Sequence, residues 1–495
     1  MKLGNVSRRK VVKGGLLGTF GVVGAASLAG CGETKTVEKI VEVPVEKIVE
    51  VEKIVEVEKQ LGVNAARTDA IVVEKVKKVE VAASQLNRQT VELWSGFDPK
   101  THGKVGGVYG SIIDIFNAGN PSHEVKHVIQ PWGQINPKLL TSVAAGNPPD
   151  AVRNWYHALG GHAEAGATTA IDKWVKRDAK TWKPEDFLAG PVAQTIFQGK
   201  RHAVPLSGIV ALLYTNLDLA KEMGVTVPAN FKTLAEAEAV GAKLYKKSGS
   251  KIKTLGFSPS MFSAPTTWAA VWGGEDVYDG KGKFNASTDD MKTLMNWHKG
   301  YADTHKGSEL VAWKSTYGTG GFGRFTSDGP LYTNLVGMAG LSSWWFSDID
   351  KQAPKQNKQW QAIPTSGSKK YRTSDLNTNV YIIPNGAKNA EGGWAWSSFL
   401  TSPKQMERKT VADSVPAIRK SLDTPFYHKA SPYNGVALTD IFPNTWKLPP
   451  FGSYGVFRKA LGTAQDQIYL GEKTVDAALA DITKATQSDI DAKAK

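Results

Sequence analysis

The chain has 495 residues, a single cysteine and a formal net charge of +14. One cysteine excludes both an internal disulfide and a cluster of thiolate ligands for a metal. The basic residues are scattered rather than gathered in a run, so the charge indicates a surface that can lie on an anionic membrane, and no nucleic-acid partner is expected.

Residues 1–30 have the pattern of an export signal and are set apart from the fold. A basic start is followed by residues 14–30, an uncharged run that is too short and too rich in glycine to span a membrane as a stable helix. Residues 7–12, with the pair Arg8 and Arg9, resemble a twin-arginine signal but lack its usual Phe. An ordinary secretory signal with two adjacent arginines is the alternative.

The uncharged run ends in Leu28-Ala29-Gly30-Cys31, which resembles the bacterial lipobox. In lipoproteins with this motif the cysteine is diacylated and becomes the first residue of the mature chain. The resemblance predicts an exported protein that Cys31 anchors in the lipid bilayer, at the outer face of the cytoplasmic membrane, in the periplasm or at the cell surface. A lipidated Cys31 would leave the mature chain without a free thiol.

Residues 31–87 are predicted to form the lipidated N-terminus and a low-complexity stalk. The unit Val-Glu-Lys-Ile-Val-Glu begins at residue 37 and recurs with a late spacing of six residues. On a helix, a six-residue period would turn the apolar stripe by roughly 120° per repeat, so no single face could pack. Fully extended, the stalk would reach on the order of 180 Å. A short oligomeric coil or β-structure is the alternative.

Residues 88–495 are too many for one hydrophobic core and predict two lobes. This part opens with a predicted strand at residues 90–94, a turn at Ser95-Gly96, a helix at residues 108–117 and a strand at residues 125–129. Strand–helix–strand alternation predicts an α/β fold with parallel strands.

Capping residues mark the starts of later helices. Thr233-Leu234-Ala235-Glu236 is a capping box, which predicts a helix through residue 245. Ser402-Pro403 combines a cap with a first-turn proline. Further helices are predicted at residues 291–301, 456–469 and 475–490.

Segments over nearly the whole of residues 88–495 resemble, in the right order, the extracellular solute-binding protein family 1, which contains maltose-binding protein. No single segment is specific, but their order is. In chain order they are Ala144-Ala145-Gly146-Asn147-Pro148-Pro149-Asp150, Gly199-Lys200-Arg201-His202-Ala203-Val204-Pro205, Leu213-Tyr214-Thr215-Asn216-Leu217-Asp218-Leu219, Gly273-Gly274-Glu275, Gly337-Met338-Ala339, Phe399-Leu400-Thr401-Ser402-Pro403, Val415-Pro416 and Thr474-Val475-Asp476-Ala477-Ala478-Leu479. The family usually has Tyr where this chain has His202, a departure that should not alter the fold.

The resemblance implies a two-lobed periplasmic-binding-protein-like type II fold. Each lobe would be a mostly parallel sheet flanked by helices, with a ligand cleft between the lobes. Crossings are expected near Ser207-Gly208, near Asn379 and at residues 447–450. Residues 88–207 with 379–447 would then form lobe 1, and residues 208–378 with 448–495 would form lobe 2.

The same resemblance implies a receptor that delivers a sugar or oligosaccharide to an ABC permease in the membrane. We expect a monomer without a cofactor. A pyranose has an apolar face that packs on aromatic rings, and its hydroxyl groups need polar partners. Aromatic and polar residues occur together where the family places its ligand contacts, and packing in the core is the alternative for each aromatic residue. The predicted ligand contacts are Trp94, Asp98, Asn154, Trp155, His157, Trp268, Trp344, Trp345 and Tyr454.

Two more tryptophans, Trp394 and Trp396, precede Phe399 on a predicted helix, which favours packing. Asp150 follows two prolines and is predicted to hold a turn rather than a ligand. Motifs for catalysis and for metal binding are poor: Gly318-Thr319-Gly320-Gly321-Phe322-Gly323 lacks the strand and helix that a nucleotide site needs, and no histidine pair has a third ligand at metal spacing. We therefore expect no catalytic residues and no metal site.

Two alternatives to a sugar receptor remain open. A binding protein for another solute, such as a polyamine or glycerol phosphate, would use the same fold with different contacts. A polyamine would need several acidic residues at the cleft, and a phosphate ester would need arginine or a helix N-terminus. An exported carbohydrate-active enzyme would need two carboxylates across a cleft.

Overall fold

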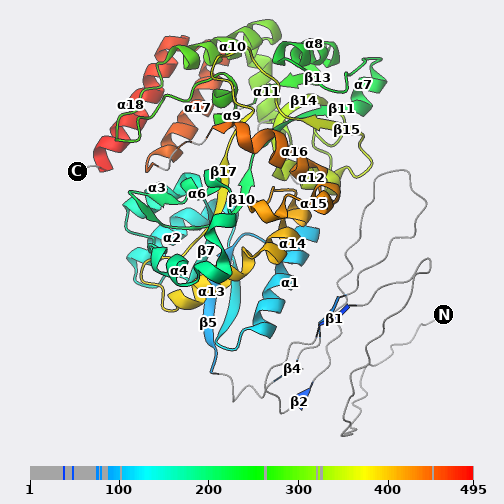
Figure 1. Cartoon of the computed structure of the whole chain (residues 1–495). Coiled ribbons are helices and arrows are strands. Elements are labelled where there is room, and N and C mark those ends of the chain that lie inside the picture. The colour runs from blue at the N-terminus through cyan, green and yellow to red at the C-terminus, as the bar shows by residue number, and fades with distance from the viewer. Residues whose placement is uncertain are drawn as a thin grey trace, which may run out of the picture. The chain divides into compact units, whose positions relative to one another are not determined.

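Two five-stranded sheets organise the part of the chain that follows residue 86 in the computed structural model (Figure 1). The first sheet has the order β10 (Val204–Ile209), β17 (Asn377–Ile382), β7 (Ala151–Trp155), β5 (Gln89–Ser95) and β6 (His123–Ile129). The second has the order β12 (Lys246–Ser248), β13 (Lys251–Ser258), β14 (Val336–Ser342), β11 (Ala211–Asn216) and β15 (Lys358–Gln361). The structure describes residues 37–39, 47–48, 74–76, 79–80, 87–100, 103–260, 265–318, 321–323, 327–446, 448 and 451–493.

The α/β class is as predicted, but parallel strands are fewer than predicted. In the first sheet β5 pairs in parallel with β6 and β7, whereas β17 runs antiparallel to both β7 and β10. In the second sheet β13 and β14 are the parallel pair, and the other three pairs are antiparallel. One reason is that β12 and β13 form a tight hairpin, which forces antiparallel pairing.

Helices cover both faces of the first sheet. On one face α1 and α13 pack through Tyr109, Phe116 and Trp396. On the other face Leu139 of α2 and Leu159 of α3 pack against the strands. The helices of this lobe are α1 (Gly103–Gly119), α2 (Ile135–Ala144), α3 (Tyr156–Glu164), α4 (Asp172–Arg177), α5 (Ala179–Trp182), α6 (Ala189–Ala193), α13 (Ala390–Leu400) and α14 (Pro403–Asp413).

The second sheet is also covered on both faces. Helices α8, α9, α10, α17 and α18 bury one face, and α11 and α12 lie on the other. Their bounds are α7 (Leu217–Glu222), α8 (Leu234–Leu244), α9 (Pro265–Val271), α10 (Asp289–His305), α11 (Gly307–Tyr317), α12 (Trp344–Gln352), α17 (Tyr454–Tyr469) and α18 (Val475–Lys493). Between α14 and α17 lie η4 (Lys420–Leu422), α15 (Pro425–Ala430), α16 (Pro432–Val436), η5 (Ala437–Ile441) and η6 (Phe442–Asn444). Tyr433 of α16 stacks on Phe346 of α12 at 4.7 Å, so this segment also packs against second-sheet elements.

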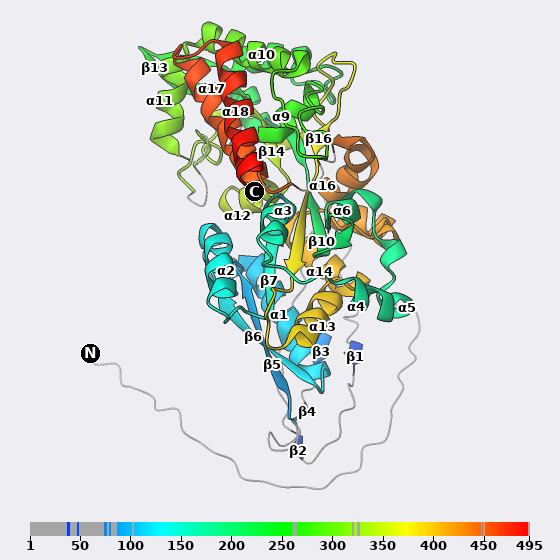
Figure 2. The same cartoon turned by 90° about the vertical axis from the view of Figure 1, so that its left-hand side faces the viewer.

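Three chain segments cross between the two sheets. Figure 2 shows β10 and β17, which lie side by side in the first sheet next to these crossings. The first crossing is Val210, because β10 ends at Ile209 and β11 begins at Ala211. The other two involve the parallel pair β16 (Ser374–Asp375) and β18 (Thr445–Trp446), and the Ala211 amide donates to Ser374 Oγ at 2.8 Å. The predicted crossing residues Ser207 and Asn379 pair with each other inside the first sheet, a few residues before the chain crosses.

Several local predictions are confirmed by the elements. The strands β5 and β6 and the helices α1, α8, α10, α14, α17 and α18 all form where the sequence predicts them, with ends that differ by a few residues. Thr233 caps α8 by accepting a hydrogen bond from the Glu236 amide at 3.2 Å, as the capping box requires. Trp394 and Trp396 are buried in the core, as predicted. No helix among the described residues is long and apolar enough to cross a membrane.

The N-terminal part contains four described strands of two or three residues. β1 (Val37–Lys39) pairs in parallel with β3 (Glu74–Val76), and β2 (Lys47–Ile48) pairs antiparallel with β4 (Val79–Glu80). The other residues of the predicted stalk before residue 87 lie outside the described residues. The chain divides into two compact units, Met1–Lys39 with Glu52–Val76 and Ile40–Val51 with Lys77–Lys495. The predicted export signal and Cys31 lie outside the described residues.

Candidate functional site

The carboxyl ends of four strands of the first sheet meet at one edge. Because β5, β6 and β7 are parallel, and β10 runs in the same direction beyond β17, these strands all end on the side of the crossing segments. Ligands of open α/β sheets generally bind at such an edge. Aromatic residues follow three of the strands directly: Phe97 after β5, Trp132 after β6 and Trp155 at the end of β7.

Arg153 of β7 lies among these rings. Its guanidinium carbon is 4.7 Å from the Trp132 ring centre and 4.5 Å from that of Trp155. Its Nη2 donates to Asn379 Oδ1 at 2.6 Å, and Asn379 Nδ2 donates to Ser207 Oγ at 2.8 Å. The side chain is buried, and its Nε and Nη1 atoms have no hydrogen-bond partner among the described residues. Burial lowers the pKa of Arg153 to about 10, so the guanidinium remains charged at neutral pH.

A buried ion pair of α14 completes this set of charges. Lys409 Nζ contacts an oxygen of Asp413 one turn later, and both side chains are almost fully buried. Lys409 Nζ is also 5.3 Å from the Phe97 ring centre, and the same ring lies 5.7 Å from the guanidinium carbon of Arg153. Burial lowers the pKa of Lys409 and raises that of Asp413, while their mutual attraction opposes both shifts.

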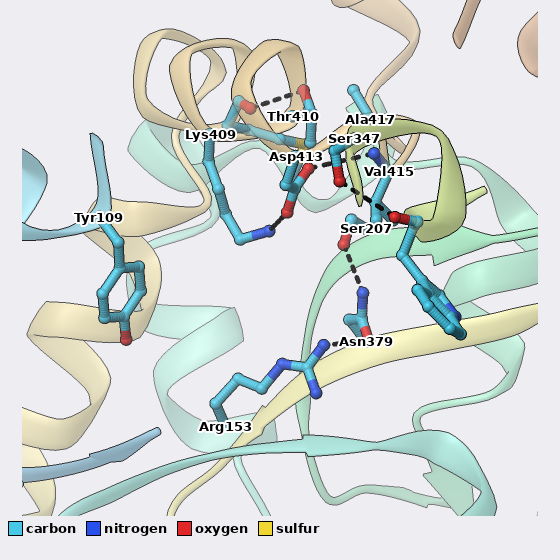
Figure 3. A network of polar contacts seen from close by, with 12 residues as sticks. Tyr109, Arg153, Ser207, Ser347, Asn379, Lys409, Thr410, Asp413, Val415 and Ala417 are labelled. Atoms are coloured by element: carbon cyan, nitrogen blue, oxygen red, sulfur yellow. Dashed lines mark hydrogen bonds and ion pairs between the residues drawn. The ribbon is translucent and has the colours of Figure 1, made fainter. Parts of the chain in front are cut away.

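Figure 3 shows Lys409 of the helix reaching Asp413 and Arg153 of the strand reaching Asn379, with Tyr109 to one side. We call the set of Phe97, Trp132, Arg153, Trp155, Lys409 and Asp413 the Arg153 cluster. Trp132 and Trp155 are half-buried, whereas the charged members are buried. The cluster therefore combines ring faces that are partly open to solvent with charges that are not.

A row of rings leads from this cluster to the second-lobe helix α17. The rings of Trp155 and His157 stack at 5.7 Å, and His157 stacks in turn on Tyr454 at 5.9 Å. Asn377, at the start of β17, lies 3.3 Å from His157 through its Nδ2 atom. Burial lowers the pKa of His157 to about 3, with a further contribution from the charge of Arg458, so this ring is neutral at neutral pH.

The comparisons with known proteins decide the family. The model of the bacterial extracellular solute-binding proteins matches residues 102–407, which is more than half of the chain. This chain belongs to that family. Its members bind solutes and act outside the cytoplasm, so the chain is an exported solute-binding protein.

Individual relatives are distant in sequence but similar in fold. A putative binding protein of Brucella abortus is 22% identical over 387 residues, which cover 76% of this chain and 88% of that protein. A protein solved with mannotriose bound has a TM-score of 0.67 at 20% identity and covers 81% of this chain and 100% of its own. An ABC substrate-binding protein from Listeria monocytogenes, solved with cycloalternan, has a TM-score of 0.66 at 16% identity over 82% of this chain and 99% of its own. At these identities the solved structures establish the two-lobed fold.

The predicted ligand contacts of this solute-binding protein fall into three groups. Trp155, His157 and Tyr454 come together in the row of rings, and Asn154 precedes them on β7. Asn154 is fully buried, its Oδ1 accepts from the Trp155 amide, and its Nδ2 has no partner among the described residues. Tyr454 is also buried, and its hydroxyl lies 3.1 Å from Thr266 Oγ1.

Three predicted tryptophan contacts are core residues instead. Trp94 packs between β7 and helices α2 and α3, and its Nε1 donates to Glu92 at 2.7 Å. Trp268 and Trp345 are fully buried, because each follows a strand of the second sheet on a helix that turns back over it. These three rings therefore offer no face to a solute in this structure.

The remaining two predicted contacts are half-buried. Trp344 begins α12 and stacks on Trp345 at 4.5 Å. Asp98 accepts a hydrogen bond from the Lys100 amide at 2.8 Å and so shapes the turn after β5. Asp150, predicted to be structural, accepts from the amides of Glu92 and Asn389 at 2.9 and 2.7 Å.

Sequence reasoning missed the charged members of the cluster. Arg153 is the one charged residue in the strand Ala-Val-Arg-Asn-Trp, and a charge within an apolar strand is a signal that could have found it. Lys409 and Asp413 are four residues apart on α14, a spacing that is also common on solvated helices, so their burial could not be seen. Trp132 follows Pro131 at the start of the short helix η1 (Trp132–Gln134) and carried no other signal.

Two further observations concern other places where a ligand or a metal ion could bind. A cavity of about 30 Å³ lies in the second lobe between Tyr301, Trp313, Lys314, Gln465 and Tyr469, and holds no predicted contact. That volume has room for one or two water molecules but not for a sugar. Within the described ranges, no group of three or more His, Cys, Asp and Glu side chains could hold a metal ion.

Proposed function

We propose that this solute-binding protein is the receptor of an ABC-type importer and that its solute is a carbohydrate. Three kinds of support agree. The chain belongs to a solute-binding family, similar folds were solved with mannotriose and with cycloalternan bound, and the first sheet ends in half-buried tryptophans beside polar groups. The last observation carries the proposal, because it concerns this chain's own residues.

The chemistry of a pyranose matches the edge of the first sheet. One face of the sugar ring presents C–H groups, which pack on aromatic rings, and its hydroxyl groups need donors and acceptors. Trp132 and Trp155 supply rings that are partly open to solvent. Asn377, whose Oδ1 is buried without a partner among the described residues, supplies a polar atom nearby.

The contacts also suggest how a solute would act on the two lobes. Trp155 and His157 belong to the first sheet and to α3, whereas Tyr454 belongs to α17 over the second sheet. A solute that touches both sides favours the arrangement in which the lobes meet, by as much as its contacts differ between the two states. The closed receptor would then dock on the permease as a monomer, with lobe 1 as residues 88–207 and 379–447 and lobe 2 as residues 208–378 and 448–495.

A binding screen tests the proposal. The full chain is titrated with mono- to tetrasaccharides while tryptophan fluorescence and the melting temperature are followed. A cognate sugar should change the fluorescence and raise the melting temperature by mass action. A panel that changes neither signal would remove the sugar assignment and leave the fold intact, and turnover of an oligosaccharide would favour the enzyme alternative.

Matched tryptophan variants locate the site. Trp155→Leu should weaken binding of the cognate sugar at least tenfold, because it removes a stacking ring. Trp272 is also half-buried but packs against Trp297 at 5.6 Å in the second lobe, so Trp272→Leu should leave the affinity unchanged. Equal loss in both variants would place the effect in the fold rather than in the site.

We also propose that Cys31 anchors the receptor in the membrane and that the twin-arginine route exports it. Metabolic labelling with a palmitate analogue should tag the unmodified chain, and Cys31→Ser should abolish the label and release the protein from the membrane fraction. Replacing Arg8 and Arg9 together by Lys should block export if the twin-arginine route is used. Normal export of that variant would assign the ordinary secretory route.

A further inference from the structure

The Arg153 cluster contains two buried cations and one buried anion. Lys409 and Asp413 form an ion pair on α14. The side chain that directly accepts from Arg153 is neutral, since the acceptor is the amide oxygen of Asn379. Tyr109 and Tyr381 lie beside the cluster, and burial raises the pKa of both, so neither supplies a negative charge at neutral pH. One positive charge is therefore left without a counterion among the described residues.

Such a charge is unusual because burial of an ion is strongly unfavourable unless a partner of opposite charge is present. Arg153 retains its proton at neutral pH, and its Nε and Nη1 atoms have no hydrogen-bond partner among the described residues. The flanking rings of Trp132 and Trp155 contribute cation–π attraction to the guanidinium, which lies 4.7 and 4.5 Å from their ring centres. The rings alone do not offset the loss of hydration.

A second buried arginine shows what a structural role looks like in the same lobe. Arg419 is fully buried, and each of its three nitrogens has an acceptor. The acceptors include a carboxylate, that of Asp186 at 3.1 Å, and the guanidinium also lies 3.9 Å from the Phe187 ring centre. Arg419 is thus completed by the protein, whereas Arg153 is not.

We propose that the anion missing from the Arg153 cluster is supplied by the solute, which is therefore an acidic carbohydrate carrying a carboxylate, as a uronic acid does. The inference rests on the proposed carbohydrate function and narrows it to one substrate class. The carboxylate would accept from the free N–H groups of Arg153, and the sugar ring would pack on Trp155 or Trp132.

The charge of the cluster favours a carboxylate over a phosphate ester. A single uncompensated positive charge is neutralised by one carboxylate, whereas a phosphate monoester carries up to two negative charges at neutral pH and would leave an excess. Planar carboxylates also match the planar guanidinium in shape. Asp413 would repel a second negative charge.

The test is a comparison of paired sugars on the full chain by isothermal titration calorimetry. Galacturonic acid and its dimer are paired with galactose and its dimer, glucuronic acid is paired with glucose, and glucose 6-phosphate reports on phosphate esters. The acidic member of at least one pair should bind about tenfold or more tightly than its neutral partner, the gain expected for a charged hydrogen bond. Tighter binding of the neutral members, or of the phosphate ester, would overturn the inference while a sugar receptor stands. If none of these sugars binds, the proposed function itself is wrong.

Two substitutions assign the preference to Arg153. Arg153→Met keeps the length and removes the charge, so the ratio of acidic to neutral affinity should fall about tenfold. Arg153→Lys keeps the charge and should retain a preference for the acid. If Arg153→Met leaves the preference intact, the proposed contact is wrong.

The melting temperature of the ligand-free protein gives a readout that needs no solute. Removing an uncompensated buried charge should leave the melting temperature of Arg153→Met equal to or above that of the unmodified chain. Arg419→Met is the matched control. It should melt well below the unmodified chain, because it leaves the carboxylate of Asp186 and three acceptors of the Arg419 side chain without that donor. An equally large drop for Arg153→Met would show a structural arginine and overturn the inference.

Discussion

Two tryptophan-rich clusters lie at strand ends of the two sheets, and they differ in what surrounds the rings. In the Arg153 cluster the rings of Trp132 and Trp155 are half-buried and enclose buried charges. In the second lobe Trp268 lies 5.0 Å from Trp297 and 6.0 Å from Phe257, and the neighbouring rings are those of Trp272 and His298. We call Phe257, Trp268, Trp272, Trp297 and His298 the Trp268 cluster.

The difference teaches how to separate a site from a core. The Trp268 cluster contains no buried ion: Trp268 Nε1 donates to the Ser260 carbonyl and Trp297 Nε1 donates to the half-buried Glu238, while Trp272 Nε1 and His298 Nε2 have no partner among the described residues. Within the part of the chain that the structure describes, the Arg153 cluster keeps donors without acceptors and also a charge without a counterion. Both clusters are rich in tryptophan and both hold buried polar atoms without a partner, so neither feature separates them, while a buried charge without a counterion points to a ligand.

The largest expected effect contrasts the two clusters through stability. Trp268→Ala removes a fully buried ring and should lower the free energy of unfolding by about 3–5 kcal/mol. Trp155→Ala removes a half-buried ring and should cost less than about 2 kcal/mol while it abolishes sugar binding. Urea unfolding measures the first quantity and fluorescence titration the second. Similar stability losses in both variants would contradict the division into core and site.

The buried ion pair should respond almost as strongly. Asp413→Asn keeps an acceptor for the Val415 amide but leaves Lys409 and Arg153 as two buried cations. Breaking one side of a buried pair typically costs about 3–5 kcal/mol, and we expect a loss of that size in urea unfolding. An acidic solute should recover more stability in this variant than in the unmodified chain. A loss below about 1 kcal/mol would mean that the charges of the cluster are hydrated.

The sequence predicted those features well that depend on residues close together in the chain, and less well those that depend on distant residues. Local features were predicted well: the capping box at Thr233 places the start of α8, and the alternation of residues 90–129 places β5, α1 and β6. Each of these depends on residues within a few turns of one another. The length of residues 88–495 predicted two lobes, whereas the crossings and the bounds of the lobes required the resemblance to a family.

The site could be predicted only in part, because burial is decided by distant residues. Trp155 and Trp268 are the same residue type near a strand end, yet one stays half open and the other is covered by α10 and its Trp297. The partner of Arg153, Asn379, lies 226 residues farther along the chain, and only the register of β7 against β17 brings them together. No local pattern could reveal that Lys409 and Asp413 face the same space from α14.

Acid should destabilise the Trp268 cluster through a histidine. His298 is fully buried, and burial lowers its pKa to about 3. In the unfolded chain a histidine titrates near about 6.5. The unfolded state therefore takes up a proton below that pH while the folded state does not, so the stability that the neutral ring contributes is present above about pH 6.5 and is lost as the pH falls toward 3.

The slope of stability against pH measures this contribution. Each such histidine should lower the free energy of unfolding by about 1.4 kcal/mol per pH unit below pH 6. Burial also lowers the pKa of His157 to about 3 and that of His162 to about 4. All three histidines therefore add to the slope of the free energy of unfolding against pH. His298→Gln can retain a polar contact with Gln465, 3.0 Å from the ring, and should flatten the slope by one proton. An unchanged slope would show that His298 is protonated in the folded state.

The smallest expected effect comes from the ion pair beside the second-lobe cavity. Lys314 Nζ donates to both oxygens of Asp466, at 2.8 and 2.7 Å. Its side chains are 32% and 37% exposed, however, so water screens the attraction and can replace either partner. Asp466→Asn should therefore cost no more than about 1 kcal/mol in urea unfolding, several times less than Asp413→Asn. Because the two substitutions are chemically identical, a difference between them measures what burial adds to the Arg153 cluster. Equal costs would mean that the cluster is as open to water as the rim of the cavity, and that its unpaired charge needs no solute to neutralise it.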